Sequence, residues 1–161
     1  MTAREIQRLR AEIASDLAAF EDRLGELERL EPEGASPAVL AQIAVALHHA
    51  YGAVEAALAR IARVLEGSMP VGADWHAALL HAMTLEIPSV RPSVLEPSSA
   101  AALRKLLAFR HFFRHAYAVA WDAEQLASLR RTALEAGPQV AADLRAFDAV
   151  LGNVAAALEE E

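Results

Sequence analysis

Residues 36–67, SPAVLAQIAVALHHAYGAVEAALARIARVLEG, decide the fold class. Ser36 followed by Pro37 is typical of a helix N-cap and first turn, and Glu66-Gly67 is typical of a helix end. Between them, large apolar side chains recur every three or four positions, which places them along one stripe of a helix of about seven turns. The stripe consists of Leu40, Ile43, Leu47, Tyr51, Val54, Leu58, Ile61 and Leu65.

The preceding segment, from Arg4 to about Glu31, has the same spacing of apolar residues, and its other positions are mostly charged. The linker EPEGASP, residues 31–37, carries two prolines and a glycine and separates the two patterns. Two long helices of similar length joined by a short linker form an antiparallel hairpin.

Three further helices are expected after the hairpin. Asp74 is the cap of the first of them, and three prolines prevent residues 87–99 from being helical throughout. The other expected boundaries are a cap at Ser98 or Ser99, a helix from Ala100 to near Trp121, a helix from about Asp122, and a break or kink at Gly137-Pro138. The sequence therefore predicts an all-α bundle of four to five helices, with residues 1–161 as a single domain.

The composition supports this fold and excludes several classes of protein. The 161 residues are 55% hydrophobic and include 38 alanines, which favours helices around a sizeable core. The absence of cysteine excludes disulfides and thiolate metal sites, and the glycines form neither a dinucleotide-binding pattern nor a P-loop. A net charge of −7 argues against nucleic-acid binding through an overall positive field.

Location is also an expectation from sequence. No run of 18 uninterrupted apolar residues is present, so we expect no membrane-spanning segment. The N-terminal stretch MTAREIQRLRAEI has charges where a signal peptide needs apolar residues, which favours a cytoplasmic protein.

Residues 109–121, FRHFFRHAYAVAW, carry the most unusual chemistry in the chain. On an ideal helix the arginines and histidines form one face, and Phe109, Phe112 and Phe113 form an aromatic face directed toward the core. A neutral histidine can transfer protons near pH 7, and arginine can stabilise the charge that develops on a phosphate. This combination fits RNA cleavage without a metal. Because Arg110 and His115 lie about 140° apart on the helix, a dimer would bring such groups together across a cleft.

Each candidate residue also has a simpler interpretation. The basic face can be an ordinary solvated surface, whereas His111 and His115, one turn apart, could share a zinc ion. The pair His48-His49 fits helix packing or a wet edge, with a contribution to a site as the alternative, and Trp75-His76 fits packing. Arg91 fits either a phosphate contact or a solvated loop residue.

The segment RHFFRHAY, residues 110–117, resembles the R-x4-H-x-Y motif of HepT-type toxins, which are ribonucleases of the HEPN superfamily. The likeness extends to LHHAYGAVEAALARIA and DWHAALLHAM, and spans roughly Leu40 to Trp121. It implies a HEPN-type bundle, a homodimer or higher homo-oligomer with the motif helices lining a shared cleft, and metal-independent endoribonuclease activity without a cofactor.

The resemblance also implies roles for individual residues. Arg110 and His115 would be catalytic, and His111 would fill the polar position that often follows the motif arginine. Tyr117 would be modified with AMP by an MntA-like nucleotidyltransferase antitoxin, and an adenylate beside Arg110 would fill the cleft and repel an RNA phosphate. Arg114, on the same basic face, is the expected RNA-binding residue.

Two alternative functions stay open at this point. The first is a non-catalytic HEPN-type module that binds a nucleotide or a nucleotidyltransferase partner through the basic face, which the acidic net charge fits equally well. The second is a helical oligomerisation scaffold without a ligand, suggested by the long apolar stripes of the first two helices.

Overall fold

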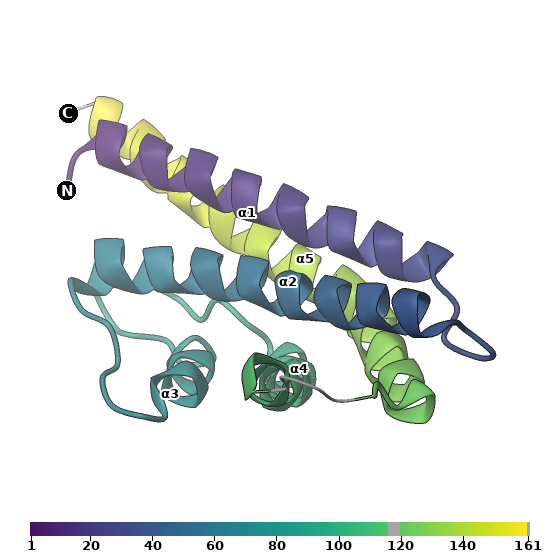
Figure 1. The fold of residues 1–161 in the computed structure, drawn as a ribbon. Coiled ribbons are helices and arrows are strands. Elements are labelled where there is room, and N and C mark those ends of the chain that lie inside the picture. Colours follow the sequence, from purple (N-terminus) through teal and green to yellow (C-terminus); the bar gives the residue numbers. More distant parts are fainter. Residues whose placement is uncertain (116–119, 161) are drawn as a thin grey trace.

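The computed structural model describes residues 1–115 and 120–160, and for His115 only the backbone. Its helices are α1 (Ala3–Arg29), α2 (Pro37–Ile61) with a π-helical continuation η1 (Ala62–Glu66), α3 (Trp75–Ala82), α4 (Pro97–His115) and α5 (Ala123–Glu159) (Figure 1). In these ranges the only β-type pairing is an isolated bridge between Ile87 and Arg91. The predicted all-α bundle is confirmed, whereas a single domain over residues 1–161 stays a prediction.

The N-terminal hairpin forms the long axis of the bundle. α1 and α2 run antiparallel, and α5 packs along α1 and crosses behind α2 (Figure 1). The residues of both predicted stripes are buried in the bundle, except Leu24 and Leu65, which are half-buried, and the predicted hairpin is confirmed. The buried side chains that join the three helices include Ile6, Leu9, Ile13 and Phe20 of α1, Ile43, Leu47, Leu58 and Ile61 of α2, and Leu144, Phe147 and Leu151 of α5.

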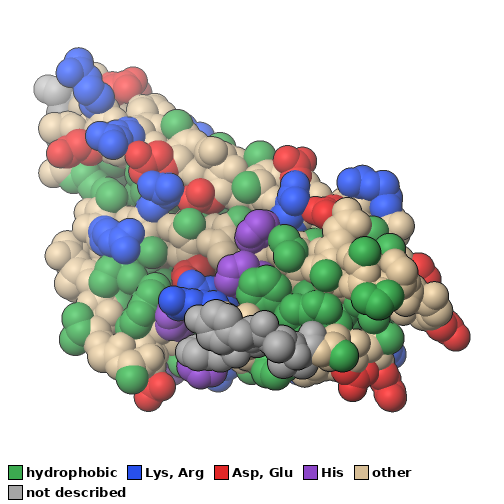
Figure 2. All heavy atoms as spheres, in the orientation of Figure 1, with side chains coloured by type: hydrophobic (Ala, Val, Ile, Leu, Met, Phe, Trp, Pro, Cys, Tyr) green, Lys and Arg blue, Asp and Glu red, His purple; other side chains and the backbone are tan. Residues whose placement is uncertain are grey.

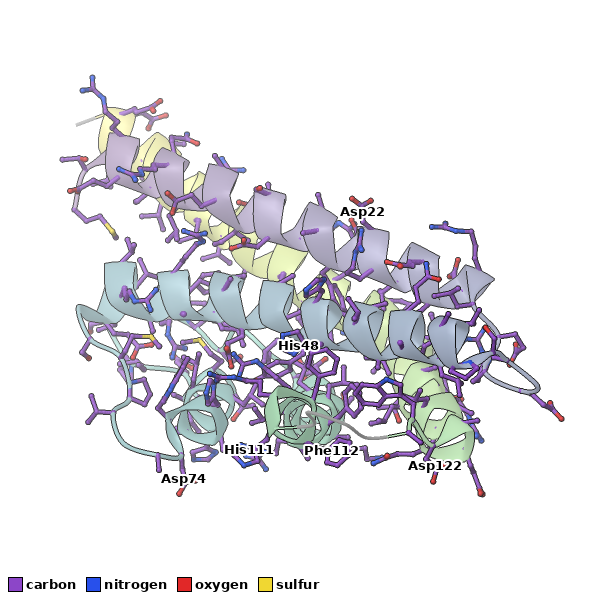
Figure 3. The ribbon with its side chains drawn as sticks, viewed as in Figure 1. Asp22, His48, Asp74, His111, Phe112 and Asp122 are labelled. Atoms are coloured by element: carbon purple, nitrogen blue, oxygen red, sulfur yellow. The ribbon has the colours of Figure 1, made fainter. Side chains whose placement is uncertain are left out.

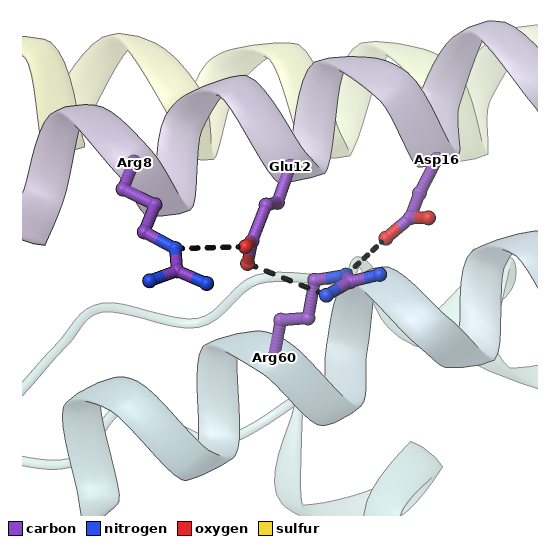
Figure 4. A network of polar contacts seen from close by, with 4 residues as sticks. All are labelled: Arg8, Glu12, Asp16 and Arg60. Atoms are coloured by element: carbon purple, nitrogen blue, oxygen red, sulfur yellow. Dashed lines mark hydrogen bonds and ion pairs between the residues drawn. The ribbon is translucent and has the colours of Figure 1, made fainter.

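A charged network at the edge of the hairpin links α1 to α2 (Figure 4). Arg60 donates from Nε to Asp16 Oδ2 at 2.8 Å and from Nη1 to Glu12 Oε2 at 3.3 Å. Glu12 Oε1 also accepts from Arg8 Nε at 3.1 Å. Because these side chains are partly exposed, each pair contributes little to stability.

The continuous helix Pro37–Glu66 is, within the described residues, long and apolar enough to cross a membrane by length and composition. The core helix of a globular bundle has the same properties, and α2 packs against α1, α4 and α5. Most of its large apolar side chains are buried within the bundle. The expected absence of a membrane-spanning segment stays a prediction.

α5 continues through Gly137-Pro138 without ending, so the alternative of a helix break is wrong. The axis of α5 changes direction along its length, as expected where proline removes a backbone donor (Figure 1). Gly137 is buried, and a Cβ atom at this position would lie only 2.5 Å from Leu24 Cδ1. The glycine therefore allows α5 to approach α1 closely.

The start of α4 differs from the prediction of a cap at Ser98 or Ser99. α4 begins at Pro97, because proline suits the first helical position, where no backbone donor is needed. The residue before it, Glu96, accepts from Ala100 N through its carbonyl and donates its N–H to Asp143 Oδ2 at 3.0 Å. Both serines consequently lie inside the first turn.

Asp74 and Asp122 lie at the helix starts where the sequence predicts them. Asp74 lies at the N-cap of α3, but its side chain makes no capping hydrogen bond in the described structure. Trp121 lies outside α4, in the segment before α5, and Asp122 caps α5 by accepting from Glu124 N and Gln125 N. The predicted start of α5 is confirmed.

Arg91 is neither solvated nor placed for a phosphate, so both interpretations from sequence are wrong. Its side chain is fully buried and pairs with Glu66 at 2.7 Å. Its guanidinium also donates to three backbone carbonyl oxygens at 2.9–3.1 Å, those of Ala82, Leu85 and Pro92. Arg91 thus holds together the loop that connects α3 to α4.

Candidate functional site

The phenylalanines of α4 are not all buried, in contrast to the prediction. Phe109 is 3% exposed and Phe113 is half-buried, but Phe112 is 40% exposed, so its assignment to the core face is wrong. Figure 3 shows Phe112 and His111 on the side of α4 that faces away from α2. α4 packs against α2, α3 and α5, and its buried arc is therefore set by three neighbours rather than by one aromatic stripe.

Arg110 points into the bundle rather than along a solvated basic face, which corrects the prediction. Its Nη2 lies 3.2 Å from Glu55 Oε1 on α2, and the side chains are 17% and 9% exposed, respectively. Its guanidinium carbon lies 5.8 Å from the centre of the Tyr51 ring, within range of a cation–π contact. Arg110 Nε is buried and has no hydrogen-bond partner among the described residues. Helix α2 thus provides both a counter-charge and an aromatic support for the motif arginine.

His76 completes the network from α3. Its Nδ1 lies 2.5 Å from Glu55 Oε2, and its Nε2 lies 3.5 Å from Arg110 Nη1. With Nδ1 as the donor to Glu55, Nε2 is left to accept from Arg110. Trp75 stacks on the His76 ring with 3.7 Å between ring centroids. The packing prediction for Trp75-His76 is therefore incomplete, because His76 also takes part in a charged network.

Tyr51 is the least exposed member of this group, at 1% exposure. Burial raises the pKa of its hydroxyl, and the negative charge of Glu55 raises it further. Tyr51 consequently stays neutral. The four residues Tyr51, Glu55, His76 and Arg110 are called the Glu55 network below.

His48 borders the Glu55 network on α2, one turn before Tyr51. Its ring stacks on Phe113 of α4, with 4.5 Å between centroids and an interplanar angle of 18°, and the His49 ring lies 5.5 Å away. Burial lowers the pKa of His48, and the positive charges of Arg110, His49 and Arg114 lower it further. Arg114 and His49 are themselves exposed.

Three other predicted site residues, His111, His115 and Tyr117, are not shown to lie at the Glu55 network. His111 is exposed and lies on the opposite side of α4 from α2, whereas Arg110 reaches Glu55 on α2 (Figure 3). The described structure therefore does not bring His111 to the Glu55 network. The side chain of His115 and all of Tyr117 lie outside the described residues, so their expected roles stay predictions.

A family model described as HepT-like protein matches residues 42–151. The chain belongs to the HepT-like family. The match covers α3, α4, all of α2 after its first turn and most of α5, and it includes the Glu55 network, His48 and the motif arginine. Neither the comparison with curated proteins nor that with solved structures gives a significant match.

The HepT-like motif arginine retains donors for a ligand even within its network. A guanidinium carries five N–H groups, and the contacts with Glu55 and His76 use one on each terminal nitrogen. Nε is buried, so the donors left for a phosphate oxygen are the second N–H of each terminal nitrogen, on a side chain that is 17% exposed. Glu55 fixes the orientation of the Arg110 guanidinium, and its negative charge partly cancels the charge of the guanidinium. The guanidinium is therefore well oriented toward a bound phosphate but attracts a distant phosphate less strongly.

Sequence reasoning missed Glu55 in this HepT-like chain and favoured packing for His76. One signal was present: Glu55 is the only acidic residue between Pro37 and Leu65 and lies four residues after Tyr51, on the apolar side of the helix. A carboxylate in such a position needs a buried partner. The identity of that partner depends on how α3 and α4 pack, which the pattern of one helix cannot give.

Metal binding by His111 and His115 was the weaker alternative from sequence. The described residues contain no group of three or more histidine or acidic side chains placed to hold a metal ion. The His115 side chain lies outside them, so the pair itself is not tested.

The lowered pKa of His48 predicts a pH-dependent stability. As the pH falls below the ordinary value of about 6.5, this histidine takes up a proton more readily in the unfolded chain than in the folded one. The free energy of unfolding should therefore fall between pH 7 and pH 5, and His48→Gln should remove part of this fall. Urea unfolding of both proteins at the two pH values measures the difference. Equal pH dependence would contradict the prediction.

Proposed function

We propose that this HepT-like chain is a metal-independent endoribonuclease and the toxin of a toxin–antitoxin pair in the cytoplasm. The observation that carries the proposal is the fixed motif arginine. Arg110 is held by Glu55 and His76, rests against Tyr51, and has a side chain that is 17% exposed. A guanidinium oriented in advance can stabilise charge on a phosphate without reorganising during the reaction.

In the proposed reaction, Arg110 stabilises the charge that accumulates on the non-bridging phosphate oxygens as the RNA 2′-hydroxyl attacks. His115 transfers a proton, since a histidine can do so near neutral pH. Arg114, exposed one turn further along α4, contacts a neighbouring RNA phosphate. His111 supports cleavage from the opposite side of α4, and we propose that it acts across a dimer cleft rather than within one protomer.

Two features of regulation belong to the same proposal. The active form is a homodimer in which two α4 helices face one cleft. An MntA-like nucleotidyltransferase antitoxin transfers AMP to Tyr117 and thereby places a bulky anion near Arg110. Family membership supports both features.

The alternative is a non-catalytic module that binds a nucleotide or a nucleotidyltransferase partner. One observation favours it: Glu55 compensates the charge of Arg110, which weakens long-range attraction of an RNA strand by a chain whose net charge is already −7. Such a module would bind its ligand without cleaving it.

The test is incubation of purified protein with transfer RNA and a labelled RNA in the presence of EDTA. Wild-type protein should cleave, and both Arg110→Ala and His115→Ala should lose cleavage. Arg104→Ala is the matched control, because Arg104 is an exposed arginine on α4 outside the site, and it should keep wild-type activity.

Two outcomes decide against the ribonuclease. Cleavage that survives in both site variants would identify a contaminating nuclease. Absence of cleavage by wild-type protein whose intact mass shows no added AMP would favour the binding module.

A further inference from the structure

His48 lies in the same interface between α2 and α4 as Arg110, and the proposed reaction has not used it. Its ring is oriented by the stack on Phe113, and its Nδ1 is buried without a hydrogen-bond partner in the described part of the chain. The residue as a whole is only partly buried. Because Nδ1 is enclosed, Nε2 is the ring nitrogen that can exchange a proton with a ligand.

The charges around His48 come from two helices. Among the described residues, the positive charges of Arg110 and Arg114 of α4 and of His49 of α2 lower its pKa, and the negative charge of Glu55 of α2 opposes them. Figure 2 shows histidine side chains next to lysine or arginine side chains near the middle of the face drawn. Figure 3 places His48 between α2 and α4, in contrast to His111 on the far side of α4. His48 therefore lies on the same side of α4 as the fixed guanidinium.

We propose that His48 is a second proton-transferring residue of the RNA-cleaving site, acting on the phosphodiester that Arg110 binds. The inference rests on the proposed ribonuclease function and adds a residue from α2 to it. Burial and the neighbouring arginines lower the pKa of His48, which keeps the ring neutral near pH 7 and able to accept a proton.

The step balances as a transesterification. His48 Nε2 removes the proton of the RNA 2′-hydroxyl while the 2′-oxygen forms a bond to phosphorus. The bond from phosphorus to the 5′-oxygen breaks, and this oxygen receives a proton from the acid of the proposed function, His115. The products are a 2′,3′-cyclic phosphate and a 5′-hydroxyl. His48 then releases its proton to water, and His115 regains a proton from water.

The same features are compatible with a purely structural role, in which His48 only packs against Phe113. His48→Phe separates the two roles, because phenylalanine keeps the aromatic stack and suits burial but cannot transfer a proton. We expect single-turnover cleavage of a short RNA in EDTA to slow by about 10²–10⁴-fold in His48→Phe. Thermal stability and RNA affinity should stay close to wild type.

Two further measurements depend on proton transfer and not on packing. Imidazole added to His48→Ala should restore part of the lost cleavage rate. Protonation of His48 should slow cleavage by the wild type at acidic pH, and this decrease should disappear in His48→Phe. His81→Gln is the control for loss of a histidine, since His81 is exposed on α3 and lies outside the site. It should cleave at the wild-type rate.

The outcomes separate this inference from the function on which it rests. If wild-type protein cleaves, Arg110→Ala does not, and His48→Phe cleaves at the wild-type rate, the role of His48 is refuted and the ribonuclease stands. If wild-type protein whose intact mass shows no added AMP does not cleave, or Arg110→Ala still cleaves, the proposed function fails and the role of His48 fails with it.

Discussion

Replacing Arg91 by methionine is expected to lower the free energy of unfolding by about 3–5 kcal/mol. The side chain is fully buried, pairs with Glu66, and donates to three backbone carbonyl oxygens of the loop between α3 and α4. Methionine fills part of the space but provides no donor. The Glu66 carboxylate, itself 18% exposed, would lose its counter-charge, and the carbonyl groups would lose their partners.

Urea unfolding monitored by circular dichroism measures this change. Arg63→Met is the matched control, because Arg63 is an exposed arginine on η1, and we expect a change within about 0.5 kcal/mol. Adding Glu66→Gln to Arg91→Met should recover part of the loss, since it removes the unpaired charge. Equal stability of Arg91→Met and Arg63→Met would show that the loop holds together without its buried arginine.

The helical hairpin was predictable because its signal is local. Apolar residues repeat along α1 and α2 at the spacing that forms one stripe. Ser36 and Pro37 mark the start of α2, and Gly67 marks the end of its continuation η1. Each of these features acts within a few residues of the place it determines. The same applies to Asp122, which caps α5 as expected.

Arg91 was not predictable in this way, because its partners come from several turns and loops. Ala82 and Leu85 lie nine and six residues before it, and Glu66 lies 25 residues before it. No periodic pattern links these positions. An arginine next to a proline therefore looks like a solvated loop residue until the path of the loop is known.

The candidate site was partly predictable for a related reason. The resemblance to HepT-like proteins drew attention to Arg110, and the family match includes this residue. A helical wheel placed Arg110 opposite the aromatic core face, but α4 has neighbours on several sides, which bury Arg110 and expose Phe112. The direction in which a side chain points on such a helix depends on packing that one wheel does not contain.

Glu55→Gln is the second variant for which we expect a large effect. Glutamine keeps nearly the same shape, but it removes the negative charge that pairs with Arg110 and contacts His76. The guanidinium would then be mostly buried without a counter-charge and should move toward solvent. We expect the cleavage rate at saturating RNA to fall by at least about 10²-fold, because a small displacement of a group that stabilises the transition state has a large effect.

Glu55 touches no substrate in this scheme and is a positioning residue, so the readout must separate orientation from folding and from charge. Single-turnover kinetics give the rate at saturation, and fluorescence anisotropy gives the RNA dissociation constant. Glu33→Gln changes the net charge equally at an exposed position and should leave both quantities near wild type. Glu55→Asp keeps the charge but shortens the side chain, and it should restore activity only in part.

The opposite result is physically distinct and equally informative. Glu55 also occupies donors of Arg110 that a phosphate could use, so a carboxylate that mainly competes with RNA would give tighter binding and faster cleavage when neutralised. The burial of Glu55 argues against this competition, since its two oxygens are already engaged by His76 and Arg110 and it lies in the interior of the bundle. Faster cleavage by Glu55→Gln would therefore show that the ion pair restrains the arginine, and slower cleavage would show that it holds the arginine in position.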